Sequence, residues 1–203
     1  MVVINPLTYL IGDMMKTAYE VAQFFLHHTY DGERDQISNL KLQKLLYYAQ
    51  GYSLAILDRP LFDEPIKCWR HGPVVESIYH YYKHHGNQCI PSVDSFNESV
   101  FDYDDLAVLN RIALEYGQYS PWKLRDMTHE ERPWKEAHAH EINGISCASI
   151  KKFFKELLNM TDICDDRHAY SYDVEAMQAS IDSGAIRVPD FTDGEDFVSW
   201  LNG

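Results

Sequence analysis

Residues 38–57 read SNLKLQKLLYYAQGYSLAIL, and this stretch is the clearest helix in the chain. Ser38 or Asn39 can serve as its N-cap, because either side chain can accept a hydrogen bond from a free amide of the first turn. Apolar residues then recur at helical spacing, namely Leu42, Leu45, Leu46, Ala49 and Ile56. Arg59-Pro60 ends the helix, since proline removes a backbone donor. The stretch predicts a helix with one buried stripe.

The same reasoning predicts that most of the chain is helical. Amphipathic or capped patterns occupy residues 14–28, 104–117, 121–127, 133–140 and 148–158. Ser120-Pro121 and Ser146 are typical of helix starts. Residues 173–184 and 193–203 read as a short helix and a terminal turn or helix, within a segment that is otherwise acidic and loop-like after Leu158. The fold class expected is mainly α with a small β element.

That β element is expected just before an unusual corner, CWRHGPVVESIYHYY at residues 68–82. Residues 65–69 alternate as a short strand does. Gly72-Pro73 is then expected to open a helix that buries Val75, Ile78, Tyr79 and Tyr82. In one interpretation the free amides of Val74 and Val75, beside Arg70 and His71, form a pocket for an anion or carboxylate. In the plainer one, Trp69 is core, Arg70 pairs with a surface acid and Gly-Pro only starts a helix.

Charge and composition limit the possible functions. The formal net charge is −13, which argues against a protein that binds duplex DNA or RNA through a basic face. From Asn159 onward ten acidic residues face two basic ones, so −8 of this charge lies in the last part of the chain. Such a segment either keeps the protein soluble or contacts a basic partner. With four isolated cysteines, no secretory signal and no long apolar run, the expected location is the cytoplasm.

No catalytic or metal motif emerges from the residues. Glu76, His80 and His84 share one face of the expected helix, but that row lies opposite its apolar face and is read as solvated. Phosphate-binding glycine loops and nucleophile elbows are both missing from the sequence. The chain is therefore predicted to bind no metal and no cofactor and to be no enzyme. A small hydrolase using His71 or His129 stays open as an alternative, and a transcriptional regulator is the weakest interpretation.

Four segments together resemble the Panacea domain, the SocA-like antitoxin family whose members are also labelled phage-associated. They are NLKLQKLLYYAQGYSLA (39–55), PLFDEPIKCWRHGPVVESIYHYYKHHG (60–86), LEYGQYSPWKLRDMTHEERPWKEA (114–137) and IKKFF (150–154). The resemblance covers about residues 14–155, and Cys68 stands where the family often has alanine. It implies a compact, mainly helical domain, here residues 1–158. Residues 159–203 lie outside the motifs and are read from their composition as an acidic extension. The positions expected to carry the motif structurally are Leu42, Lys44, Leu45, Tyr47, Trp69, Gly72, Pro73, Val74, Tyr79, Gly117, Pro133 and Trp134.

The resemblance also implies a function by binding. Family members resemble antitoxins that neutralise a toxin encoded beside them, and one is an adaptor that delivers its toxin to a protease. The expectation is a protein that inhibits a toxin or bacterial enzyme with a basic surface, or alternatively a phage inhibitor of a host defence protein. The residues expected to contact this partner are Arg70, His71, Glu76, His129, Asp165, Asp166, Asp193, Glu195 and Asp196. Oligomeric state is left open.

Overall fold

The computed structural model describes residues 16–28 and 37–164. The chain divides into two compact units, Met1–Asp162 and Ile163–Gly203. Nearly all the described residues belong to the first unit, and the last described helix ends at Cys164. The expected partner contacts Asp165, Asp166, Asp193, Glu195 and Asp196, and the elements expected at residues 173–184 and 193–203, lie outside the described residues.

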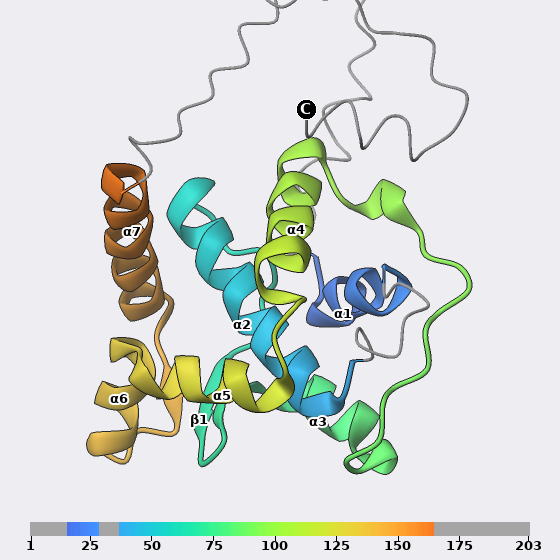
Figure 1. The fold of residues 1–203 in the computed structure, drawn as a ribbon, viewed down its shortest axis with the longest axis horizontal. Coiled ribbons are helices and arrows are strands. Elements are labelled where there is room, and N and C mark those ends of the chain that lie inside the picture. Colours follow the sequence, from blue (N-terminus) through green and yellow to red (C-terminus); the bar gives the residue numbers. More distant parts are fainter. Residues whose placement is uncertain (1–15, 29–36, 165–203) are drawn as a thin grey trace, which may run out of the picture. The chain divides into compact units, whose positions relative to one another are not determined.

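The described part is mainly helical with one small sheet, which confirms the expected fold class (Figure 1). Its helices are α1 (Ala18–His27), α2 (Asn39–Ile56), α3 (Glu76–Tyr82), α4 (Tyr103–Tyr116), α5 (Pro121–Glu130), α6 (Arg132–Ala139) and α7 (Cys147–Cys164). Its strands are β1 (Ile66–Trp69), β2 (Gly72–Val75) and β3 (Gly144–Ile145). Two 3₁₀ turns, Lys83–His85 and Glu98–Val100, lie on either side of the irregular stretch between α3 and α4.

Helix α2 runs through the middle of this unit and packs against α1, α4, α5 and β2 (Figure 1). Ser38 caps it, as expected, by accepting a hydrogen bond from the amide of Lys41. Leu42, Leu45, Leu46 and Ala49 of the predicted stripe are buried, and so is nearly every other side chain from Asn39 to Leu54. Ile56, placed in that stripe, is 47% exposed, since it lies in the last turn beyond these neighbours. A helix with partners all around it buries polar residues as well as apolar ones.

The three strands form an antiparallel sheet in the order β2-β1-β3. Ile66 pairs with Val75 and Trp69 with Gly72, so Arg70 and His71 form the turn between β1 and β2. The expectation that Gly72-Pro73 opens a helix is therefore wrong: both residues belong to β2, and α3 begins at Glu76. Proline fits a strand here because Pro73 lies opposite Cys68 at a position whose backbone groups point away from β1.

The other helix starts match the capping chemistry of the sequence. Thr17 forms a capping box with Glu20 at the start of α1. Ser120 accepts a hydrogen bond from the amide of Lys123, with proline in the first turn of α5. The hydroxyl of Ser146 accepts one from the amide of Ser149, as predicted for α7. Helix α7, however, continues to Cys164, so the loop expected directly after Leu158 does not begin there.

None of the helices that the structure describes is both long enough and apolar enough to span a membrane.

Candidate functional site

The turn between β1 and β2 presents exposed cationic and aromatic side chains. Arg70 and His71 are exposed at its tip. The ring of His71 meets the indole of Trp122, from the first turn of α5, edge-on with 6.1 Å between ring centroids. Trp122 is itself 60% exposed, which is unusual for so large an apolar side chain. We call Trp69, Arg70, His71, Tyr79 and Trp122 the corner surface.

The corner surface rests on a fixed support. Trp69 is half-buried, and its ring meets Tyr79 of α3 edge-on at a centroid distance of 4.9 Å. The indole nitrogen of Trp134, in α6, donates a hydrogen bond of 3.0 Å to the carbonyl oxygen of Trp69. Trp69 and Tyr79 were both expected to be buried, and each is only partly so. Arg70 and His71 lie at the rim of this corner, as expected.

The outer edge of β2 is covered by side chains of α2. Lys44 Nζ donates a 2.9 Å hydrogen bond to the carbonyl oxygen of Pro73, and the amide of Val75 donates one of 2.8 Å to Gln43 Oε1. Val74 lies in β2 opposite Lys67. The predicted pocket with free amides at Val74 and Val75 is thus overturned, because one amide belongs to a strand pair and the other is bonded to Gln43.

Gly72 is required where β2 begins. Its φ of +99° lies in the region that favours glycine, and a Cβ there would come within 2.6 Å of Lys44 Nζ and 2.8 Å of Thr128 Oγ1. The absent side chain lets the strand lie directly against Lys44 in α2 and Thr128 in α5. The turn that carries Arg70 and His71 is thereby tied to two helices.

Burial shifts the pKa values of two titratable groups, Lys44 in α2 and Glu131 between α5 and α6. Lys44 is fully buried, and burial, with a smaller contribution from Arg125, lowers its pKa to about 7. Glu131, between α5 and α6, accepts a 2.8 Å hydrogen bond from the hydroxyl of Tyr48. Burial raises the pKa of the Glu131 carboxyl to about 7, although Tyr48, Tyr47 and Lys44 oppose the rise. Burying ionisable groups has a free-energy cost, which these contacts partly offset.

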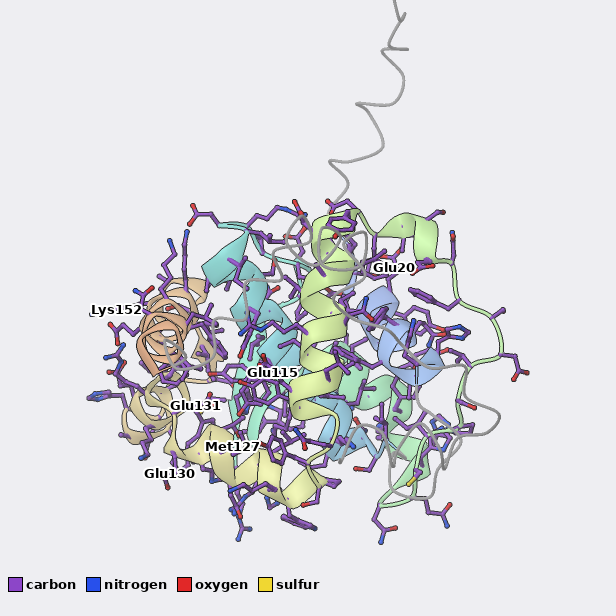
Figure 2. All side chains as sticks on the ribbon, turned by 45° about the horizontal axis from the view of Figure 1, so that its top comes forward. Glu20, Glu115, Met127, Glu130, Glu131 and Lys152 are labelled. Carbon is purple, nitrogen blue, oxygen red and sulfur yellow. The ribbon has the colours of Figure 1, made fainter. Side chains whose placement is uncertain are left out.

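Adjacent glutamates have different surroundings in this corner. Glu130 forms a 2.6 Å ion pair with Lys135 and is 80% exposed, whereas Oε2 of Glu131 is buried. Figure 2 shows the Glu131 label nearer the middle of the protein and that of Glu130 nearer its edge. Of the two, Glu131 is therefore the one that bonds to α2, through the hydroxyl of Tyr48.

His129 lies in an aromatic stack and not on the corner surface. Its ring stacks on Trp134 at a centroid distance of 3.8 Å, and His138 stacks on the same indole at 4.5 Å. Burial, followed by the charges of Arg125 and Lys44, lowers the pKa of His129 to about 4. Neither His129, stacked on an indole, nor His71, facing one, is shown beside a nucleophile in the described residues. The contacts thus give the hydrolase alternative no support.

The predicted row of Glu76, His80 and His84 is exposed. His80 Nε2 lies 3.8 Å from the carboxylate of Glu76, while Nδ1 of His84 lies 3.0 Å from the carbonyl oxygen of Tyr81. Within residues 16–28 and 37–164, no three metal-ligating side chains come together. Glu76 is the first residue of α3, directly after β2. Strand β2 therefore separates it in the sequence from Arg70 and His71.

The sequence predicted some residues of this site and did not indicate others. Most positions expected to carry the motif structurally are buried, and Trp69, Tyr79 and Gly117 are partly so. Sequence reasoning gave no indication of Gln43 and Thr128, which contact β2, of Glu131, which bonds to Tyr48, or of Trp122, which is 60% exposed on the corner surface. Trp122 directly follows the predicted helix start Ser120-Pro121, and this position in the first turn could have indicated that it is exposed. A tryptophan in an exposed first turn is uncommon.

Comparison with known proteins shows what a part of this sequence resembles. Residues 42–135 match the family described as Antitoxin SocA-like, Panacea domain. A segment of 54 residues is 43% identical to Antitoxin SocA of Caulobacter vibrioides (strain NA1000 / CB15N), and it covers 27% of this chain. The chain matches only 29% of that antitoxin's length. No solved structure matches the chain significantly.

Proposed function

Residues 42–135 are a SocA-like Panacea domain, and from this premise we propose that the protein is an antitoxin-like binding protein rather than an enzyme. It neutralises a toxin, or inhibits a bacterial enzyme, by direct protein–protein contact. The Caulobacter relative is itself an antitoxin, although the match spans under a third of it. Delivery of the bound partner to a protease, and inhibition of a host defence protein by a phage-encoded copy, are versions of the same binding function.

The observation that supports a binding function best is the corner surface. Trp122 is exposed beside His71, with Arg70 on the same turn, and tryptophan and arginine are enriched among residues that dominate interface energies. Gly72 and Lys44 hold this turn against α2, so little conformational entropy is lost when a partner binds. Arg70 has no ion-pair partner in the part of the chain that the structure describes, so it is available to an acidic group of the partner.

The acidic extension provides a second contribution. Residues 159–203 contain ten acidic and two basic residues, and they lie outside residues 42–135. A net charge of −8 there attracts a basic partner surface and raises the rate of encounter. We assign the extension to steering and the corner surface to docking, in line with the proposal that residues 1–158 form the binding domain.

Capture and rescue test this function together. The tagged full chain is used to capture partners from a lysate of its host at low and high salt, and captured proteins are identified by mass spectrometry. The partner gene is then expressed with and without this chain. The proposal expects one stoichiometric partner that inhibits growth alone and does not when this chain is present. A captured protein whose effect on growth is unchanged by this chain would contradict neutralisation.

A further inference from the structure

The two edges of the three-stranded sheet differ in how their backbone groups are satisfied. At the β2 edge, Gln43 and Lys44 of α2 bond to the amide of Val75 and the carbonyl of Pro73. At the other edge is β3, Gly144–Ile145, which pairs with β1 on one side only. An edge strand whose outer groups are free is a template for pairing with another strand. The β3 edge is therefore the open one.

The register shows which groups are free. The amide of Cys68 donates a 2.9 Å hydrogen bond to the carbonyl of Asn143, beside the pair Lys67–Gly144. Bonded and non-bonded pairs alternate along an antiparallel ladder. Lys67 and Gly144 are thus a non-hydrogen-bonded pair, and the N–H and C=O of Gly144 point away from β1. Within the described ranges, no backbone or side-chain group bonds to either of them.

A groove lies alongside this edge, between α6 and the start of α7. It has a volume of about 380 Å³ and is lined by Pro133, Glu136, Ala137, His140, Ile142, Gly144, Ile145, Ser146 and Ser149. Ile142 is 54% exposed, and a Cβ built on Gly144 would have no atom within 4 Å. Figure 1 shows the segment between α6 and α7 passing close to β1. There is space for an added backbone and for an apolar side chain.

No lysine or arginine is among the described residues that line the groove. Glu136 lines it, and its carboxylate is 3.8 Å from Arg132 Nε, too far for a tight pair. Glu141, in the loop beside it, is exposed and forms no ion pair with any residue of ranges 16–28 and 37–164. An extended occupant that carries lysine or arginine would neutralise both carboxylates.

We propose that the β3 edge and its groove bind an extended, basic segment of the protein partner, which adds to the sheet as a fourth strand beside Gly144. The inference rests on the proposed function, because it assumes a protein partner. Strand addition supplies affinity through main-chain hydrogen bonds and specificity through alternate side chains. The site also adjoins the corner surface: Trp134 of α6 bonds to Trp69, and Asn143 bonds to Cys68. One partner can therefore cover both.

A peptide probe tests strand addition without knowing the partner. The full chain is titrated with acetyl-KVKVKVK-amide, and with acetyl-EVEVEVE-amide as the charge control. Nuclear magnetic resonance follows the amide of Gly144 and its hydrogen exchange. We expect that the basic peptide shifts this amide and slows its exchange, and that the acidic peptide binds at least about tenfold more weakly. An unshifted Gly144 amide, or equal binding of both peptides, would overturn the proposal.

Backbone variants separate strand addition from simple charge attraction. Gly144→Pro removes the free N–H and should weaken binding of the basic peptide by about tenfold, whereas Gly144→Ala retains it and serves as the control. Because proline can also disturb β3, the same basic peptide with N-methylated valines is used on the unaltered protein. It should lose binding to a similar extent. Full binding of the N-methylated peptide would contradict main-chain pairing.

Two further outcomes keep this inference apart from the proposed function. If the captured partner binds Gly144→Pro as tightly as the unaltered chain, the edge is not its site, although the antitoxin-like function stands. If the peptide binds but no partner is neutralised, the edge binds strands and the function fails. Protection of the Gly144 amide without peptide, together with a concentration-dependent dimer in sedimentation, would show a second copy of this chain as the occupant and overturn the proposal.

Discussion

The side-chain nitrogen of Lys44 lies 2.9 Å from the carbonyl oxygen of Pro73, and this contact joins the central helix to β2, the strand that follows the turn of Arg70 and His71. Lys44 thereby supplies a buried hydrogen-bond donor to a carbonyl group on the outer edge of β2. The same nitrogen lies beside Gly72, where a Cβ would come within 2.6 Å of it. Helix, strand and turn therefore depend on one another at this junction.

Replacing Gly72 should destabilise the fold. In Gly72→Val, a β-branched residue would have to adopt a φ of +99° and would crowd Lys44 Nζ and Thr128 Oγ1. We expect a loss of about 2–4 kcal/mol in the free energy of unfolding, measured by urea denaturation. Gly144→Ala is the matched control, because no atom lies within 4 Å of its added Cβ, and it should change little. Equal midpoints for Gly72→Val and the unaltered chain would refute this role.

Lys44→Met should remove a buried hydrogen bond and change the pH dependence of stability. The substitution leaves the carbonyl of Pro73 without its donor, which costs about 1–3 kcal/mol. Burial lowers the pKa of Lys44 from 10.5 to about 7, so the unfolded chain binds more protons above pH 7. This group's contribution to stability is lost as pH falls through about 7 and grows toward pH 10.5. Denaturation profiles should show that rise in the unaltered chain and not in Lys44→Met; parallel profiles would contradict it.

Glu131→Gln tests a pH dependence of stability that is opposite in sign to that of Lys44. Burial raises the pKa of this carboxyl from 4.5 to about 7, so the folded chain binds the extra proton. The contribution is fully present below pH 4.5 and is lost as pH rises through about 7, with a slope of at most about 1.4 kcal/mol per pH unit. Glutamine keeps an acceptor for the Tyr48 hydroxyl and cannot ionise. The difference in unfolding free energy between variant and unaltered chain should therefore change across this window; a constant difference would exclude the assignment.

Removing the acidic extension should weaken partner binding while the domain stays folded. Because α7 runs to Cys164, the cut belongs after that residue rather than at Leu158. We expect a lower association rate and a smaller dependence of affinity on salt, since the steering charge is gone. Circular dichroism and the thermal midpoint check that the domain is intact. Unchanged affinity and salt dependence in the truncated chain would show that the extension does not meet the partner.

The sequence predicted the helices well because the residues that start and end a helix act on neighbouring backbone groups. Ser38, Ser120 and Ser146 each cap a helix as predicted, since capping depends only on the neighbouring amides. Gly72-Pro73 misled because all four residues of β2 are buried, so no alternation is visible and a Gly-Pro pair is equally typical of a helix start. Residues 72–75 form a strand rather than a helix because β1 pairs with them and α2 covers their outer edge.

The candidate site was harder to predict for a similar reason. Lys44 looks like a surface residue in a chain with this many charges, and only the packing of α2 against α5 and β2 buries it, while Glu131 becomes partly buried. Trp122 has the opposite character, an apolar residue that ends exposed because it lies on the outer face of the first turn of α5. Neither outcome follows from periodicity within one helix. Both depend on elements distant in the sequence.

The affinity of the captured partner for Trp122→Ala tests the central claim most directly. Trp122 is 60% exposed, so its removal should change the free energy of unfolding by no more than about 0.5 kcal/mol. Tyr103→Ala, an aromatic residue 85% exposed on α4, is the matched control. We predict that titration calorimetry finds binding weakened by at least about tenfold in Trp122→Ala and unchanged in Tyr103→Ala. Equal affinities for Trp122→Ala and the unaltered chain would contradict docking at the corner surface.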